Sequence, residues 1–339
     1  MKGLELSERY FFDCGLPLLK EHCPDLVGRV AAGLVGSGSE VAGFDDEVSR
    51  DHNWGPRFIL FLGEDDEARH GKRVQEILDR HLPREYLGAS IHRTGTAFQS
   101  SPGAVATPGK SCWFNTGFTS APVDDLAWLA IPEHRLFEFT AGKIFYEPIP
   151  LISPLRETFA YFPEMVWLKR LSFVWLQMSH CANISRTIAR GNRVTSHAFL
   201  DWGLECCMRL AFMLNRRYAP FRKWLYHAFQ GLPSLPAGIC EKMEHVVSLS
   251  DLAQVEAALL DIMDAFGVMV NESGLIPPQP LRMKRDERFL PFNFTGYMQA
   301  FWQSLKGPLR DMNPHDGPMD LWGAIYIPLH TNLTQGIRW

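Results

Sequence analysis

The sequence predicts an α+β protein with a small mixed sheet in its first half and an α-helical bundle in its second. Three observations predict this class. Short apolar runs of strand length precede residue 150, long helical periodicities follow it, and the 339 residues are 46% hydrophobic and 21% charged, which is typical of a globular protein. A chain of this length usually divides into two domains, and we place the boundary at the prolines of 148–154. The expected domains are therefore 1–150 and 151–339.

The first domain is expected to contain short strands and amphipathic helices. Residues 8–35 show helical periodicity, and 30–35 could equally end that helix or form a short strand. The run 57–62 predicts a strand, and residues 64–80 predict a charged helix. Further predictions are a long loop or irregular strands over 88–122, a short helix over 124–131, and two strands joined by a turn at 135–139 and 143–146.

The second domain is predicted from helical patterns. These patterns occupy 155–162, 164–182, 195–217, 221–230, 235–248 and 251–266, and either Ser250 or Asp251 could cap the last one. The segment 277–339 is rich in proline and asparagine, so we expect an irregular tail that wraps the bundle.

Charge and cysteine usage exclude several classes of protein. The net charge of −4 disfavours DNA binding, because a protein that neutralises phosphates normally carries a basic surplus. The seven cysteines are irregularly spaced without a C-x-x-C pair, which argues against a disulfide framework or a structural zinc site. No apolar run reaches about 18 residues, so no membrane span is predicted. A cytoplasmic protein is expected, and the sequence predicts no particular oligomeric state.

One motif points to phosphoryl-transfer chemistry. Gly38-Ser39 is followed, after eleven residues, by Asp51-x-Asn53 in front of the predicted strand. A glycine-serine turn at a helix N-terminus lets backbone N–H groups approach nucleotide phosphates. Oxygen ligands at positions i and i+2 of an extended segment point to the same side and can hold Mg²⁺. A carboxylate from a neighbouring strand would complete the site, and Glu147 at the end of the run 143–146 is the candidate.

This arrangement resembles the nucleotidyltransferase superfamily, which includes polymerase beta and kanamycin nucleotidyltransferase. More of the chain is similar to an uncharacterised bacterial branch with a domain of unknown function. One block reads Gly-Ser-Gly-Ser-Glu over 36–40, Gly-Phe-Asp-Asp over 43–46 and Ser-Arg-Asp-His-Asn-Trp-Gly-Pro-Arg over 49–57. A second reads Tyr-Ala-Pro-Phe-Arg-Lys-Trp-Leu over 218–225, with Ala-Phe at 228–229. The likeness covers about 25–232.

The resemblance implies transfer of a nucleoside monophosphate from a nucleotide triphosphate, with ATP as the first candidate, to a small-molecule acceptor. It implies Mg²⁺ or Mn²⁺ held by Asp51, Asn53 and Glu147. The expected catalytic groups are Asp51, Glu147 and, as proton acceptor, Asp46. The expected nucleotide-binding residues are Gly36, Ser37, Gly38, Ser39, Arg57, Arg186 and Lys223.

Two departures from the family pattern motivate an alternative function. Asn53 stands where the family has a second aspartate, and Glu147 is longer by one methylene than the usual third acid. The alternative is a degenerate nucleotide-binding or regulatory module without catalysis. An RNA-directed enzyme and a module with a fixed protein partner are further alternatives, the first disfavoured by the acidic balance.

Several of these residues also have simpler explanations. Residues 45–47 could form a solvated acidic turn instead of supplying a ligand or a base. Arg57 and Lys143 could be surface charges, and Lys223 could lie over an apolar surface with its ammonium in water. Arg186 could be a charge at a helix end, near Asn192, which replaces another family acid.

Overall fold

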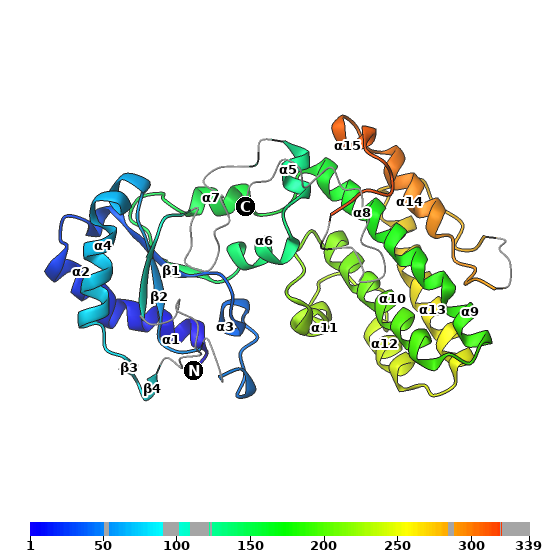
Figure 1. Cartoon of the computed structure of the whole chain (residues 1–339), viewed down its shortest axis with the longest axis horizontal. Coiled ribbons are helices and arrows are strands. Elements are labelled where there is room, and N and C mark those ends of the chain that lie inside the picture. Colours follow the sequence, from blue (N-terminus) through cyan, green and yellow to red (C-terminus); the bar gives the residue numbers. More distant parts are fainter. Residues whose placement is uncertain are drawn as a thin grey trace. The chain divides into compact units, whose positions relative to one another are not determined.

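The structure is a computed structural model that describes residues 1–50, 54–90, 102–108, 122, 124–283, 288–318 and 320. It consists of two compact units (Figure 1). The first contains Met1–Pro122 and His134–Ala160, and the second contains Val123–Glu133 and Tyr161–Trp339. The first unit carries a small mixed sheet and the second is helical, so the predicted α+β class is confirmed.

The sheet of the first unit has the strand order β5-β2-β1-β6. Its strands are β1 (Ala31–Leu34), β2 (Phe58–Phe61), β5 (Gly103–Ala106) and β6 (Lys143–Tyr146). β1 pairs antiparallel with both β2 and β6, whereas β2 and β5 are parallel. The predicted strands at 57–62 and 143–146 are confirmed, and 30–35 is a strand instead of a helix end. A separate hairpin joins β3 (Glu85–Tyr86) to β4 (Ala89–Ser90).

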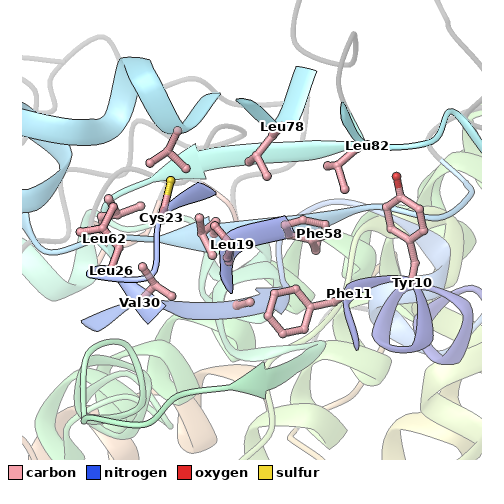
Figure 2. Packing of buried hydrophobic residues seen from close by; sticks show 13 residues of the cluster. Tyr10, Phe11, Leu19, Cys23, Leu26, Val30, Phe58, Leu62, Leu78 and Leu82 are labelled. Carbon is pink, nitrogen blue, oxygen red and sulfur yellow. The ribbon is translucent and has the colours of Figure 1, made fainter. Parts of the chain in front are cut away.

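Helices cover this sheet with apolar side chains. α1 (Gly3–Tyr10), a π-helical segment at Phe11–Gly15 and α2 (Leu16–His22) form the helical part of the region where periodicity over 8–35 predicts helix. The predicted charged helix is α4 (Glu64–His81), whose apolar face joins the same core. Figure 2 shows this cluster of buried residues, which combines the helices with β1 and β2. Its labelled members are Tyr10, Phe11, Leu19, Cys23, Leu26, Val30, Phe58, Leu62, Leu78 and Leu82.

The strand predicted at 135–139 is wrong, because these residues belong to the helix α6 (Glu133–Thr140). Five residues with apolar side chains at 136, 137 and 139 are too few to distinguish a period of two from one of 3.6. The helical spacing of Leu136 and Phe139 buries both side chains. The chain then turns at Gly142, where φ is +75° and a Cβ would lie 2.0 Å from the carbonyl oxygen of Leu34. Only glycine fits this entry into β6.

Two segments near the predicted boundary belong to the unit with which they make contacts. Residues up to Ala160 stay with the sheet, because α7 (Ser153–Thr158) is bound to Glu147 and Arg156 donates to the carbonyl oxygens of Thr140 and Ala141. Residues 123–133 belong to the helical unit, where α5 (Asp125–Leu129) packs against α8 (Glu164–Met178). α5 is the short helix predicted over 124–131.

The second unit is built around α8, which is buried on most of its surface. α10 (Arg193–Leu214) and α14 (Phe294–Gln303) pack against it. The remaining helices are α9 (Ile184–Ala189), α11 (Leu225–Gln230), α12 (Ile239–Ser248), α13 (Leu252–Glu272) and α15 (Pro308–Asp311). Asp251, and not Ser250, caps α13, since its carboxylate accepts from the N–H of Ala253 at 2.8 Å.

The expectation of an irregular tail after residue 277 is wrong for its central part. α14 buries Phe294, Tyr297, Met298, Ala300 and Phe301. The prolines and asparagines that predicted an irregular tail lie before and after this helix. Asn293 caps the helix by accepting from the N–H of Gly296. Among the described helices, none is long and apolar enough to cross a membrane.

Candidate functional site

The candidate site is one end of the sheet in the first unit. The antiparallel register pairs Gly33 of β1 with Ile59 near the start of β2, and Leu34 with Lys143 at the start of β6. The loop that follows β1 therefore lies at the same end as the residue before β2, Arg57. This loop is Gly36–Ser39, which the sequence predicts to bind phosphate.

The loop has a conformation that requires glycine. Gly36 has φ of +103° and Gly38 has φ of +150°. The N–H of Gly36 donates to the carbonyl oxygen of Glu138 at 2.8 Å, which attaches the loop to α6. After Gly38 the chain enters the single turn α3 (Ser39–Ala42). Within the described residues, the N–H groups of Ser37, Gly38 and Ser39 have no acceptor.

Arg57 supports the loop from inside the unit. Its side chain is buried and forms an ion pair with Glu40, to which its Nε donates at 3.2 Å. Its Nη2 also donates to the carbonyl oxygen of Ser37 at 3.3 Å. The structure therefore gives Arg57 a defined partner that ties the start of β2 to the loop, and Arg57 is not a surface charge.

Glu40 is nearly completely buried, at 1% exposure, and only one of its carboxylate oxygens contacts Arg57. Its Oε2 has no hydrogen-bond partner among the described residues. A Cβ placed on Gly38 would lie 2.8 Å from that oxygen. The buried carboxylate thus lies directly against the loop.

Asp45 anchors the start of α1 beside the loop. Its Oδ2 accepts from the N–H of Gly3 at 2.8 Å and from Nε1 of Trp54 at 3.1 Å, and the ammonium of Lys2 lies 3.5 Å from Oδ1. Burial alone would raise the pKa of Asp45, but these hydrogen bonds and Lys2 lower it. Asp45 is buried, so it does not belong to a solvated acidic turn.

Asp46, the expected proton acceptor, is exposed on the following turn. Its Oδ1 accepts from the N–H and the hydroxyl of Ser49, both at 2.8 Å. These hydrogen bonds lower the pKa of Asp46, which makes its carboxylate a weaker base. The arrangement is that of a capped turn, and it leaves one carboxylate oxygen for another contact.

Asp51 and Asn53, the expected metal ligands, lie outside the described residues, as does His52. The residues on either side are described. The guanidinium of Arg50 lies 4.7 Å from the centre of the Trp54 ring, and Trp54 bonds Asp45. Both flanks of Asp51–Asn53 are thus attached to the Gly36–Ser39 end of the first unit.

Glu147 lies at the opposite end of the sheet. Because β6 is antiparallel to β1, Lys143 is opposite Leu34, whereas Tyr146 is opposite Ala32. Lys143 and Glu147 are four residue steps apart at about 3.3 Å each, a distance of roughly 13 Å. The expected convergence of Glu147 with the glycine-serine loop therefore needs correction, since the sequence shows which strand carries an acid but not the direction of that strand.

The carboxylate of Glu147 is also engaged. Its Oε1 accepts from the N–H groups of Leu151, Ile152 and Ser153 at 2.8, 2.6 and 3.0 Å, and its Oε2 accepts from the Ser153 hydroxyl. Burial raises the pKa of Glu147, but the bonds from Ser153 and its neighbours outweigh that effect and lower it. Glu147 thus caps the start of α7.

Lys143 and the two expected phosphate-binding cations of the second unit have partners of their own. Lys143 donates to the carboxylate of Glu8 at 2.7 Å. In the second unit, the Arg186 guanidinium lies 4.7 Å from the Phe289 ring centre, and the Lys223 ammonium lies 5.2 Å from that of Trp224. Asn192 caps α10 by accepting from the N–H of Thr195 at 3.2 Å. A neutral asparagine serves this capping role as well as an acid does.

The described residues by themselves do not form a Mg²⁺ site. No group of three or more His, Cys, Asp or Glu side chains there could hold a metal ion. At the loop end, Glu40 pairs with Arg57, Asp45 accepts a hydrogen bond from the start of α1, and Asp46 accepts from Ser49. Any divalent cation at this end would depend on Asp51 and Asn53.

Two residues of this end, Glu40 and Trp54, are not among the site residues predicted from the sequence. Glu40 directly follows the Gly-Ser-Gly-Ser run and precedes apolar residues, while Arg57 opens an apolar strand. Charged residues at the borders of two buried segments are expected to pair, because an isolated buried charge is costly. That signal is present in the sequence, but it does not identify the partner.

Comparison with known proteins adds a family match and a structural likeness. The family model described as "Domain of unknown function (DUF4037)" matches residues 128–225, a segment that does not include the Gly36–Ser39 loop. No curated protein matches the chain. Among solved structures, the chain is similar to a nucleotidyltransferase-like protein from Exiguobacterium sibiricum 255-15, with a TM-score of 0.37, 9% identity and 77% of each chain covered.

Proposed function

We propose that the Gly36–Ser39 end of the sheet binds the phosphates of a nucleoside triphosphate, ATP being the first candidate. One observation carries the proposal. The loop presents N–H groups of Ser37, Gly38 and Ser39 that have no acceptor within the described residues, and the buried Arg57–Glu40 pair holds this loop in place. Successive N–H groups in a glycine-containing turn form a concave site that suits phosphate oxygens.

The pair makes this loop a preorganised site. Arg57 is fixed by Glu40 on one side and by the Ser37 carbonyl on the other, so its guanidinium acts on the loop through hydrogen bonds within the protein. A loop held before the ligand arrives loses little conformational entropy on binding. Arg57 therefore supports nucleotide binding by positioning the loop.

We further propose that the bound nucleotide reacts with a small-molecule acceptor. The acceptor oxygen attacks the α-phosphorus in line, the bond from that phosphorus to the bridging oxygen breaks, and pyrophosphate leaves. A carboxylate at this end takes the acceptor's proton. Asp51 is our first choice and Asp46 the second, because the bonds from Ser49 lower the pKa of Asp46.

Dependence on Mg²⁺ or Mn²⁺ is part of the proposal and rests on Asp51 and Asn53. Carboxylate and amide oxygens are ligands that these cations accept, and a cation there would neutralise phosphate charge. Glu147 is not part of the proposed site. Its place at the other end of the sheet and its bonds to α7 favour a structural role.

The small number of carboxylates at the loop end favours a second candidate, nucleotide binding without transfer. With Glu147 at the other end and Asn53 in place of an acid, the loop end has fewer carboxylates than the family pattern implies. A module of this kind would bind a nucleotide and release it unchanged.

The two candidates separate in one experiment. Full-length protein is titrated calorimetrically with ATP and the other triphosphates, with and without Mg²⁺ or Mn²⁺, and is then incubated with α-labelled triphosphate and a small-molecule extract. Binding with labelled product and pyrophosphate supports transfer, and binding alone supports the second candidate. No binding of any triphosphate would overturn both.

The site assignment needs a matched pair of variants. Asp51→Ala is expected to abolish product formation, while Asp65→Ala, at an exposed position of α4, is expected to leave it unchanged. Full activity of Asp51→Ala would overturn the assignment of this residue. Arg186→Ala and Lys223→Ala test whether the helical unit contributes to phosphate binding.

A further inference from the structure

The second unit contains a buried group of charged side chains that the proposed nucleotide site does not use. Arg170, in the middle of α8, is completely buried. Its Nη1 and Nη2 donate to the two carboxylate oxygens of Asp320 at 3.2 and 2.9 Å, and its Nη2 also donates to Glu133 at 2.9 Å. A second arginine, Arg209 of α10, lies 3.8 Å from the Glu133 carboxylate. This cluster of Arg170, Arg209, Glu133 and Asp320 lies wholly within the second unit.

The carboxylate of Asp320 binds the guanidinium of Arg170 in the geometry with which arginine binds oxyanion ligands. Two parallel N–H···O bonds from one guanidinium to one carboxylate form the fork that also binds phosphates. Asp320 comes from a segment 150 residues away in the chain, whereas its partners all belong to the matched segment 128–225. The Asp320 carboxylate thus binds like a ligand at a site that residues of the segment 128–225 form.

The ion pairs show which counter-charges the two arginines would keep without the Asp320 carboxylate. Arg209 shares its second carboxylate, Glu205, with the exposed Arg222. Glu205 is itself buried, so it remains a counter-charge of Arg209 when Asp320 is withdrawn. Withdrawal of Asp320 leaves Arg170 with Glu133, a carboxylate that Arg209 also approaches. A buried arginine that loses its bidentate partner is costly until another anion replaces it.

Two buried donors, one in the cluster and one beside it, lack acceptors among the described residues even with Asp320 in place. Neither Nε of Arg170 nor the hydroxyl of Tyr161 has a hydrogen-bond partner among the described residues. The pKa of Tyr161 is raised by burial and by the nearby Glu133, so its hydroxyl stays protonated and able to donate. A buried donor without an acceptor is rare in native proteins. Hydrogen-bonding capacity therefore remains for an anion with more oxygens than a carboxylate.

The segment that carries Asp320 also contacts α8 beside Arg170. Nζ of Lys169 donates to the carbonyl oxygens of Asn313 and Pro314 at 3.4 and 3.5 Å, which are long hydrogen bonds. Gly317 packs on the ring of Phe173, where a Cβ would lie 2.3 Å from the ring. Residues 313–318 and Asp320 thus form a strap over α8, and the strap includes the contact between Asp320 and Arg170.

We propose that Arg170 and Arg209 form an oxyanion-binding site whose internal occupant is the carboxylate of Asp320. A ligand that bears a phosphate or a carboxylate group competes with Asp320 for Arg170. Its binding releases the strap from α8. The proposal is independent of nucleotide binding in the first unit.

The first test uses full-length Asp320→Ala, with Asp311→Ala as the matched control, since Asp311 is an exposed acid of α15. Inorganic phosphate and formate are titrated against both variants and the wild type at constant ionic strength in chloride, with melting temperature and calorimetry as readouts. We expect saturable binding to Asp320→Ala that is roughly tenfold or more tighter than to wild type or Asp311→Ala. Adding Arg170→Gln to Asp320→Ala should abolish that gain. The preferred anion identifies the group that the site takes.

The second test uses the wild type and does not depend on the folding of any variant. Hydrogen exchange of peptides that cover 313–320 is measured with increasing phosphate or formate, and peptides of α13 serve as the internal control. Competition predicts faster exchange in the strap alone. The proposal is overturned if folded Asp320→Ala binds neither anion more tightly than Asp311→Ala. It is also overturned if the strap exchanges at the same rate at saturating phosphate and formate.

Discussion

Arg57 and Glu40 form a buried ion pair that connects the first residue before β2 to the helical turn after the glycine-serine loop. Arg57 is 8% exposed and Glu40 is 1% exposed. The pair also holds the loop itself, since Arg57 donates to the carbonyl oxygen of Ser37. Buried pairs of this kind contribute little net stability, but the loss of one partner leaves an uncompensated charge.

We therefore expect Glu40→Ala to lower the free energy of unfolding by about 3–5 kcal/mol, because Arg57 would stay buried without a counter-charge. Urea unfolding measures the change. Glu47→Ala, an exposed acid of the same region, should stay within about 0.5 kcal/mol of wild type. The double variant Glu40→Leu/Arg57→Met should regain most of the loss. A cost below about 1 kcal/mol for Glu40→Ala would contradict the importance of the pair.

Gly38→Ala should impair both the loop and nucleotide binding. The added Cβ would lie 2.8 Å from the buried Oε2 of Glu40, and φ of +150° is unfavourable for alanine. Strain of this kind costs about 1–3 kcal/mol, and nucleotide affinity should fall about tenfold or more. Gly28→Ala is the control, because a Cβ there meets nothing within 4 Å. Equal nucleotide affinity in the two variants would argue against the loop as the phosphate site.

Glu147→Ala is expected to lower stability by about 1–2 kcal/mol through loss of the α7 cap, while nucleotide binding is retained. The effect depends on pH with a definite sign. The bonds from Ser153 lower the pKa of Glu147, so its contribution is present above the ordinary value of 4.5 and disappears as the pH falls through the lowered one. Unfolding curves recorded from about pH 3 to about pH 7 measure this contribution, because that range spans the ordinary pKa of the carboxyl group. Glu157→Ala, on the exposed side of α7, is the control. If Glu147→Ala folds but no longer binds nucleotide, Glu147 is part of the nucleotide site and its structural assignment is wrong.

Lys169→Met should change the pH dependence of stability on the alkaline side. Burial lowers the pKa of Lys169 from 10.5 to about 8, although the charge of Asp316 opposes the shift. Between these values the unfolded chain binds the extra proton, so the contribution of Lys169 to stability rises with pH.

The unfolding free energy of Lys169→Met minus that of wild type should consequently fall between pH 8 and 10.5, by up to about 3 kcal/mol. Taking this difference cancels the tyrosines and cysteines that titrate in the same range. Lys306→Met, at an exposed position, should give a flat difference. A flat difference for Lys169→Met as well would show that the ring of Trp302, 4.3 Å from Nζ, compensates the burial.

Sequence patterns predicted the elements whose signals are local. The run 57–62 is a strand because it is apolar and rich in branched and aromatic residues, and α4 and α13 follow from helical spacing and, for α13, from the Asp251 cap. The residues 135–139 were ambiguous because five residues do not separate a period of two from one of 3.6. α14 was obscured by the prolines and asparagines on both sides of it.

By itself, the sequence determined the α+β class, the glycine-serine motif at 36–39 and the position of Arg57 at the start of a strand. Only the tertiary structure decided that Glu40 is the partner of Arg57 and that Glu147 lies at the far end of the sheet. It also decided that Asp320 contacts Arg170. The reason is physical, because residue type and spacing specify local conformation, whereas strand direction and the pairing of distant charges depend on how the elements pack.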